Sequence, residues 1–119
     1  MDTRTVVEHY FQCINSGRWD DYLRLFDDNI VMDEQVLGRV EGIEAMSKAI
    51  EPLRANPNFR NYPQTFVVEG IRAMVRWHII STDSHNKTLD LKGVNYYEVV
   101  GGKIVYFANF HDTLPFHTD

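Results

Sequence analysis

Hydrophobic residues in the first half of the chain recur at helical spacing. From residue 2 to residue 16 they follow intervals of three and four, and Gly17 then serves as a C-terminal cap. A second, shorter stretch with this pattern covers residues 18–26, and a third covers residues 42–56, where Pro52 tightens or kinks the last turn. The pattern therefore predicts three helices before residue 57.

The remaining hydrophobic segments have the composition of strands. A short strand at residues 30–32 precedes Gly38, which permits a turn into a second strand. Four longer strands follow, at residues 61–69, 71–82, 88–100 and 103–113. Their short connections favour an antiparallel meander. Helices followed by a long, bent antiparallel sheet predict a single α+β domain over residues 1–119, with a pocket between the sheet and the helices.

Alternation along the predicted strands assigns side chains to the two faces of the sheet. On the fourth strand, Trp77 shares a face with apolar residues, whereas polar residues occupy the other face. The face of Trp77 carries Ala73, Val75 and Ile79, and the opposite face carries Arg72, Arg76 and His78. On the last two strands the same rule groups Leu91, Gly93, Asn95 and Tyr97, and then Val105, Phe107, Asn109 and His111.

Composition and charge exclude several classes of function. The chain has 119 residues, 44% hydrophobic and 24% charged, which is typical of a soluble globular protein. Its formal net charge of -5 argues against a surface that binds nucleic acid. No apolar leader or membrane segment is present at the N-terminus, so we expect a cytoplasmic protein that does not bind membranes.

Metal and cofactor chemistry has no support in the sequence. Cys13 is the only cysteine, so neither an intrachain disulfide nor a thiolate metal cluster can form. The five histidines show no ligand spacing, and there is no glycine-rich phosphate loop. We therefore expect a protein without a metal or a cofactor.

Three segments of the chain resemble a known family. They are YFQCINSGRWDDYLRLFDDNIVMDE, GRVEGIEAMSKAI and GKIVYFANFHDT. Together they resemble the ketosteroid-isomerase-like, or SnoaL-like, domains related to nuclear transport factor two. The resemblance extends over nearly the whole chain and implies a cone-shaped, curved antiparallel or mixed sheet, wrapped around three N-terminal helices with an internal pocket. Members of this superfamily have very different functions, so the fold alone does not identify an activity.

The resemblance also implies a set of catalytic positions. In ketosteroid isomerases a carboxylate at the end of the first strand moves a proton, while a tyrosine and a protonated aspartate hold the oxyanion. The carboxylate position falls on Glu34, with Asp33 one residue earlier, although the family usually has aspartate followed by proline here and this chain has Glu34-Gln35. Tyr10 resembles the oxyanion tyrosine. Asn95 stands where the aspartate is expected, and its amide still offers two donors.

The last strand carries a further candidate base. In limonene epoxide hydrolases, and similarly in polyketide cyclases of this superfamily, an aspartate on this strand is the base, and Asn109 stands at that position. His111 could replace it, because histidine titrates near neutral pH. The sequence leaves the base open between Glu34, Asp33 and His111. The residues expected to line the pocket and bind the ligand are Met32, Trp77, Tyr97 and Phe107.

Two classes of function remain after these steps. The first is a cofactor-free enzyme that moves protons on a small hydrophobic, carbonyl-bearing molecule of polyketide or steroid type, as an isomerase, dehydratase or cyclase. The second is a noncatalytic ligand-binding or assembly domain, in which the polar candidates are structural or merely orient a ligand. In both cases the partner is a small hydrophobic ligand, and the resemblance implies a homodimer formed through the outer face of the sheet.

Overall fold

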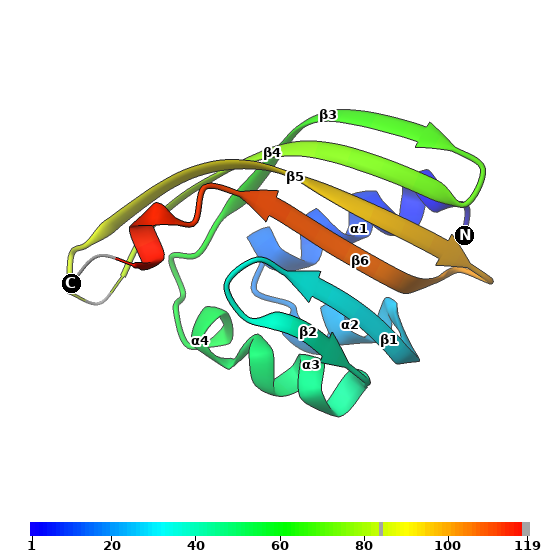
Figure 1. The fold of residues 1–119 in the computed structure, drawn as a ribbon, viewed down its shortest axis with the longest axis horizontal. Coiled ribbons are helices and arrows are strands. Elements are labelled where there is room, and N and C mark those ends of the chain that lie inside the picture. The colour runs from blue at the N-terminus through cyan, green and yellow to red at the C-terminus, as the bar shows by residue number, and fades with distance from the viewer. Residues whose placement is uncertain (84, 118–119) are drawn as a thin grey trace.

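The computed structural model describes residues 1–83 and 85–117 and shows one curved sheet wrapped around helices (Figure 1). The six strands have the order β2-β1-β6-β5-β4-β3. The helices are α1 (Thr3–Asn15), α2 (Trp19–Arg24), α3 (Ile43–Ala49) and α4 (Glu51–Arg54), with a 3₁₀ turn at Leu114–Phe116. The strands are β1 (Phe26–Glu34), β2 (Gly38–Glu41), β3 (Asn61–Glu69), β4 (Arg72–Thr82), β5 (Thr88–Val100) and β6 (Lys103–His111).

The sheet is mixed, because one of its pairs is parallel. β1 runs parallel to β6, and the pairs β1–β2, β3–β4, β4–β5 and β5–β6 are antiparallel. The pairing of the last two predicted strands is confirmed, and so is the predicted α+β fold with a curved sheet. The parallel pair matters for the site, since it brings the end of β1 beside the end of β6 although the two are far apart in sequence.

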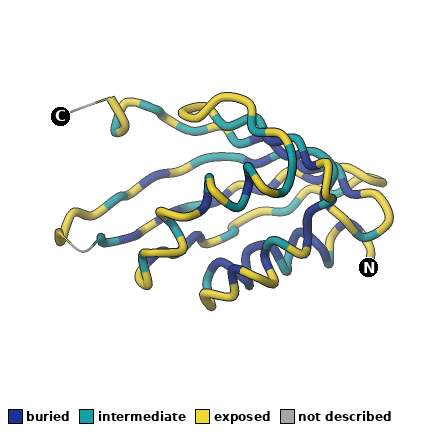
Figure 2. The backbone as a smooth tube through the Cα atoms, turned by 90° about the horizontal axis from the view of Figure 1, so that it is seen from below, coloured by how far each residue is buried: buried dark blue, intermediate teal, exposed yellow. Residues whose placement is uncertain are grey.

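Helix α1 supplies the largest apolar face beneath the sheet. Asp2 caps its N-terminus, with its carboxylate accepting a hydrogen bond from Thr5 N at 2.8 Å. The buried residues Val6, Val7, Tyr10, Phe11 and Ile14 lie on one side of the helix. Figure 2 shows how buried and exposed residues alternate along the backbone.

Within the described residues, no helix is long and apolar enough to cross a membrane.

Three predicted boundaries were wrong, and the first two have a local reason. The second helix ends at Arg24 and β1 already begins at Phe26, because the Leu25 carbonyl accepts a hydrogen bond from Ile104 N at 2.8 Å. The third helix divides into α3 and α4, since Pro52 has no N–H to continue the helical hydrogen bonds and sits instead in the first turn of α4. The last strand ends at His111 rather than at residue 113.

A bulge in β6 corrects the predicted face of Val105. The pairing shifts so that Glu98 lies opposite Tyr106 while Val99 lies opposite Ile104, which leaves Val105 as an extra residue. As a result Ile104, with 0% of its surface exposed, takes the inward place that alternation had given to Val105. Beyond the bulge, Phe107, Asn109 and His111 keep the predicted inner face.

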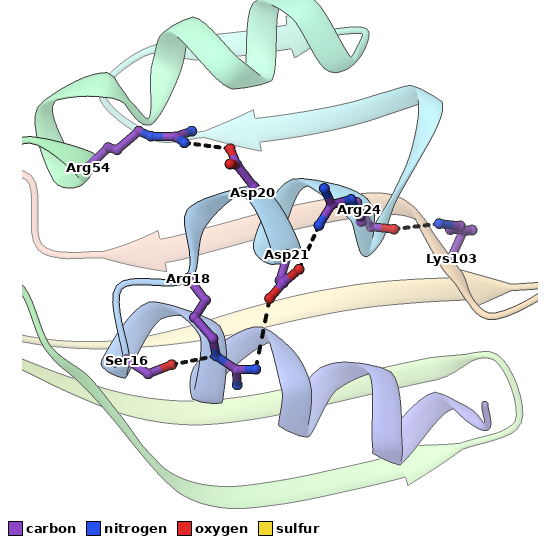
Figure 3. A network of polar contacts seen from close by, with 7 residues as sticks. All are labelled: Ser16, Arg18, Asp20, Asp21, Arg24, Arg54 and Lys103. Atoms are coloured by element: carbon purple, nitrogen blue, oxygen red, sulfur yellow. Dashed lines mark hydrogen bonds and ion pairs between the residues drawn. The ribbon is translucent and has the colours of Figure 1, made fainter.

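Charged side chains join the short helix α2 to its neighbours at the surface (Figure 3). Asp20 pairs with Arg54 of α4, and Asp21 pairs with Arg24 at 2.6 Å. The Arg24 carbonyl also accepts a hydrogen bond from Lys103 of β6. All of these groups are exposed, so each contributes little to stability. The buried side chains of Trp19 and Tyr22 instead hold α2 against the interior.

Candidate active site

A cavity of about 330 Å³ lies between the inner face of the sheet and the helices. Most of its lining is apolar, with contributions from β1, β4, β5 and β6 and from the helices α1, α3 and α4. A few polar side chains also reach it: Tyr10, Tyr22, Glu34, Asn61, Trp77, Asn95, Asn109 and His111. A mainly apolar cavity with a few polar groups is the usual form of a site for a small molecule.

The strand register arranges the inner face in parallel rows, because cross-strand partners point to the same face. One row is apolar, the next is mostly polar, and the third contains an indole and an imidazole. The apolar row is Met32, Phe107, Tyr97 and Ala73, the polar row is Glu34, Asn109, Asn95 and Val75, and the third row is His111, Gly93 and Trp77. Glu34, Asn109 and Asn95 are therefore immediate neighbours on three adjacent strands.

Glu34 and His111 form a pair at one end of the polar row. His111 Nε2 lies 3.0 Å from Glu34 Oε1, and the side chains are only 6% (His111) and 14% (Glu34) exposed. The other carboxylate oxygen, Oε2, accepts hydrogen bonds from the backbone N–H groups of Val36 and Leu37 at 2.7 and 2.6 Å. Since those two amides can only donate, any proton on the carboxyl group must reside on Oε1, facing the imidazole.

The second ring nitrogen of His111 shows which ring nitrogen carries a hydrogen. Nδ1 lies 2.8 Å from the backbone carbonyl of Asp112, which can only accept, so Nδ1 carries a hydrogen. Nε2 then either donates to the Glu34 carboxylate or accepts from the protonated carboxyl group. In both arrangements one proton lies between Nε2 and Oε1, so the two atoms share a single proton position.

Asn95 is held in one orientation by an indole. Trp77 Nε1 donates to Asn95 Oδ1 at 2.8 Å, and Asn95 Nδ2 donates to the Tyr97 hydroxyl at 2.9 Å. Because the indole N–H is only a donor, the amide oxygen must face Trp77 and the amide NH₂ must face the tyrosines. Asn95 is 2% exposed, so the cavity contains a fixed amide donor at the position expected from the sequence.

Tyr10 lies among aromatic rings beneath Asn95. Its ring centroid is 5.2 Å from that of Tyr97 and 5.1 Å from that of Tyr22. Burial raises the pKa of Tyr10 to about 12, against the opposing effect of hydrogen bonds from Tyr22, Tyr97 and Asn95. Burial also raises the pKa of Tyr22 and of Tyr97 well above the ordinary value. The three phenols therefore remain protonated at neutral pH and can act as hydrogen-bond donors.

Asp33 lies on the outer face of the sheet and does not line the cavity. Its carboxylate accepts two hydrogen bonds from Arg39, both at 2.9 Å, and one from the Tyr106 hydroxyl at 2.6 Å. Arg39 first, and then Tyr106, lower the pKa of Asp33 to about 2. Of the two adjacent carboxylates, the structure thus brings Glu34 together with Tyr10 and Asn95 in one cavity and leaves Asp33 apart.

Three polar or aromatic groups at the cavity were not predicted from the sequence. Tyr22 comes from α2, Phe116 from the C-terminal 3₁₀ turn, and Asn61 from the first position of β3. The ring of His111 lies near two other rings. Its centroid is 5.5 Å from that of Phe116 and 6.1 Å from that of Trp77. Alternation on β3 contained a signal for Asn61, but the register shift after Pro63 obscures it.

No metal centre accompanies these groups in the part of the chain that the structure describes. Residues 1–83 and 85–117 contain no cluster of three histidine, cysteine, aspartate or glutamate side chains suited to a metal ion.

Gly93 is the position where the backbone makes room for Trp77. A Cβ atom built on Gly93 would lie 2.4 Å from Trp77 Cζ2 and 2.5 Å from the Phe110 carbonyl oxygen. We expect Gly93→Ala to displace the indole from Asn95 and to lower the free energy of unfolding by about 1–3 kcal/mol, the usual cost of overpacking. Urea unfolding measures this cost, and a variant as stable as the wild type would show that the indole has space to move.

Comparison with known proteins supports the resemblance seen in the sequence. The family model of the SnoaL-like domain matches residues 7–107. No functionally curated protein matches the chain in sequence. An NTF2-like protein of unknown function from Burkholderia pseudomallei K96243 is similar in structure, with a TM-score of 0.86 and 17% identity, covering 98% of this chain and 95% of that chain.

Two further solved structures are similar at the same level. A putative SnoaL-like polyketide cyclase from Jannaschia sp. CCS1 has a TM-score of 0.82 and 18% identity, covering 98% of this chain and 89% of that chain. SalBIII, an epoxide hydrolase/cyclase-like enzyme of pyran ring formation in the polyether salinomycin, has a TM-score of 0.83 and 18% identity, covering 92% and 90%. These structures establish a shared fold. Since the family model matches most of the residues, the chain belongs to the SnoaL-like domain family.

Proposed function

We propose that the protein is a cofactor-free enzyme that moves a proton on a small apolar molecule bearing a carbonyl group. The observation that carries the proposal is the Glu34–His111 pair, which lines a mainly apolar cavity together with the donors Tyr10 and Asn95. A base and fixed donors in one apolar cavity are what enolisation requires, because a bound substrate that displaces water strengthens the hydrogen bonds to its oxygen.

In the proposed reaction Glu34, backed by His111, is the base, and the pair starts without a proton between the two groups. The C–H bond next to the carbonyl breaks, its electrons move to the carbonyl oxygen, and the proton enters the position between Glu34 Oε1 and His111 Nε2. Tyr10 and Asn95 donate hydrogen bonds to the enolate oxygen. Two strand spacings, about 9–10 Å, separate the backbones of Glu34 and Asn95. That space accommodates a reacting carbon and its carbonyl oxygen.

The fate of the proton decides the type of reaction. Return to another carbon is an isomerisation, transfer to a departing hydroxyl group is a dehydration, and attack of the enolate on a second carbonyl closes a ring. Solved structures with the same fold include a putative SnoaL-like polyketide cyclase and an enzyme of pyran ring formation, and they support cyclisation of a polyketide-like molecule as a specific candidate.

A noncatalytic binding domain is the second candidate function. It is favoured by the two amides, Asn95 and Asn109, that stand where the family's ketosteroid isomerases and epoxide hydrolases have aspartates. Amides orient a ligand by hydrogen bonds but do not titrate. In that case Glu34 and His111 form a structural ion pair, and the cavity binds its ligand unchanged.

Exchange of carbon-bound hydrogen with solvent separates the two functions. We expect the wild-type protein to accelerate deuterium uptake from D₂O at the acidic C–H positions of β-tetralone, a small bicyclic ketone, above the rate in buffer alone. NMR spectroscopy follows the exchange. Binding of the ketone without accelerated exchange would contradict the enzyme and support the binding domain.

We also propose that a second copy of the chain covers the outer face of the sheet. Val67, Met74, Ile80 and Phe110 are exposed there by 63%, 45%, 45% and 50%. Large exposed apolar side chains on one face are typical of an interface. Light scattering at micromolar concentration should give about twice the chain mass of 13.9 kDa, and Phe110→Asp should lower it. A monomer mass for the wild type would overturn the dimer.

A further inference from the structure

Two amide oxygens at the cavity have no partner of their own. Within residues 1–83 and 85–117, neither Asn61 Oδ1 nor Asn109 Oδ1 accepts a hydrogen bond, and both atoms are buried. Both side chains line the cavity. A buried acceptor without a donor destabilises a protein, so such atoms in a native structure call for an explanation.

The backbone of Asn61 is fixed while its side chain is left free. Asn15 of α1 donates from Nδ2 to Asn61 O at 2.7 Å and accepts from Asn61 N at 2.8 Å. This double contact anchors the first residue of β3 to α1. Asn61 is 4% exposed, and its neighbours in the cavity include the apolar side chains of Ile14, Phe59 and Ile79. The amide oxygen is therefore an isolated acceptor in an apolar wall.

Asn109 presents its acceptor at a different part of the cavity. It lies on β6 directly between Glu34 and Asn95, next to the proposed base. Asn61 lies on the edge strand β3 opposite Ile79, whereas the row of Asn109 crosses β4 at Val75, four residues along that strand. The two acceptors are thus separated both across the sheet and along the strands.

We propose that the molecule bound in this cavity is apolar in its middle and carries hydrogen-bond donors, hydroxyl or N–H groups, at both ends. Asn109 accepts from the donor near Glu34, and Asn61 accepts from the donor at the far end. This inference deepens the proposed function, on which it rests, by defining the natural substrate as a carbonyl compound that also carries hydroxyl or N–H groups, of which β-tetralone contains only the reacting part. It makes Asn61 a residue that determines specificity.

A matched pair of probes tests the proposal at equilibrium. The first is a naphthalenediol with hydroxyl groups at opposite ends of the ring system, and the second is its dimethyl ether, which lacks both donors. We expect the wild-type protein to bind the diol at least tenfold more tightly by calorimetry, since an unpaired buried acceptor costs about a factor of ten or more. Binding of neither probe, equal binding, or preference for the ether overturns the proposal.

Substitutions assign the preference to the two amides. Asn61→Leu, which replaces the amide by an apolar side chain of similar size, should reduce the preference for the diol about tenfold, and so should Asn109→Leu. Asn58→Leu is the matched control, because Asn58 is exposed and does not line the cavity. A preference that survives in Asn61→Leu, or that is lost equally in Asn58→Leu, contradicts the assignment to Asn61.

A second measurement does not depend on any probe. With no ligand bound, Asn61→Leu removes an unpaired acceptor from an apolar wall, so its melting temperature should rise above that of the wild type. A fall would show that Asn61 has a partner within the protein in solution. Neither experiment involves turnover, so a failure of the proton-transfer reaction in the β-tetralone assay remains distinguishable from a failure of this inference.

Discussion

Glu34→Gln should lower the rate of deuterium exchange into β-tetralone on the order of a hundredfold or more, the usual contribution of a positioned base. Glutamine keeps the size of the side chain, and its amide oxygen can still accept from the backbone N–H groups of Val36 and Leu37. It cannot take up a proton, so the chemistry is lost while the local turn is preserved. Circular dichroism and the melting temperature should remain close to those of the wild type.

Asp33→Asn is the matched control for this prediction. Asp33 precedes Glu34 in sequence, but its carboxylate lies on the outer face with Arg39 and Tyr106. The same chemical change there should leave the exchange rate within about twofold of the wild type, because the outer face has no contact with the cavity. If Glu34→Gln remained active while His111→Ala lost all activity, the base would be His111 and the assignment to Glu34 would be wrong.

Phe107→Ala should lower the free energy of unfolding by about 3–5 kcal/mol, the range for removing a buried aromatic ring. Phe107 is 2% exposed and stacks on Tyr97, with 5.3 Å between ring centroids and 10° between ring planes. It also contacts Tyr10 at 5.5 Å and Phe26 at 6.1 Å between centroids. Its loss therefore removes ring contacts that β6 makes with β5, α1 and β1.

Denaturant unfolding of Phe107→Ala and Phe116→Ala measures this effect against the same chemical change elsewhere. Phe116 belongs to the C-terminal 3₁₀ turn and is 44% exposed. Its replacement should cost less than about 1 kcal/mol, as is usual for exposed sites. Equal costs for the two variants would mean that Phe107 is not the centre of the aromatic core.

The pattern of hydrophobic residues was sufficient to predict most of the strands. The predicted bounds of β3 and β5 are confirmed. The inner face of β4 with Trp77 is confirmed as well, because buried residues occupy every second position of this strand and leave only one way to bury it. The bulge at Val105 left no such signal. An extra residue changes the face of its neighbours without changing the composition of the strand.

The sequence predicted only part of the candidate site, namely the part that depends on alternation within a single strand. Alternation predicted that Glu34 and Asp33 face opposite sides, but not which of the two faces is the inner one. The Glu34–His111 contact depends on the parallel register of β1 and β6, which joins residues 77 positions apart. Local patterns contain no information about such a pairing. The unpaired oxygen of Asn61 was likewise beyond prediction, since it depends on which groups surround this side chain in the folded protein.

The account depends on the contact between Glu34 Oε1 and His111 Nε2, which receives the proton of the substrate, and nitrogen NMR of the histidine rings tests this contact most directly. In protein labelled with ¹⁵N at histidine, the His111→Gln variant identifies the signals of residue 111. We predict that His111 Nδ1 is protonated, and that Glu34→Gln shifts the Nε2 signal while Asp33→Asn does not. A neutral His111 with its hydrogen on Nε2 and a bare Nδ1, or an Nε2 signal unaffected by Glu34→Gln, would contradict the account.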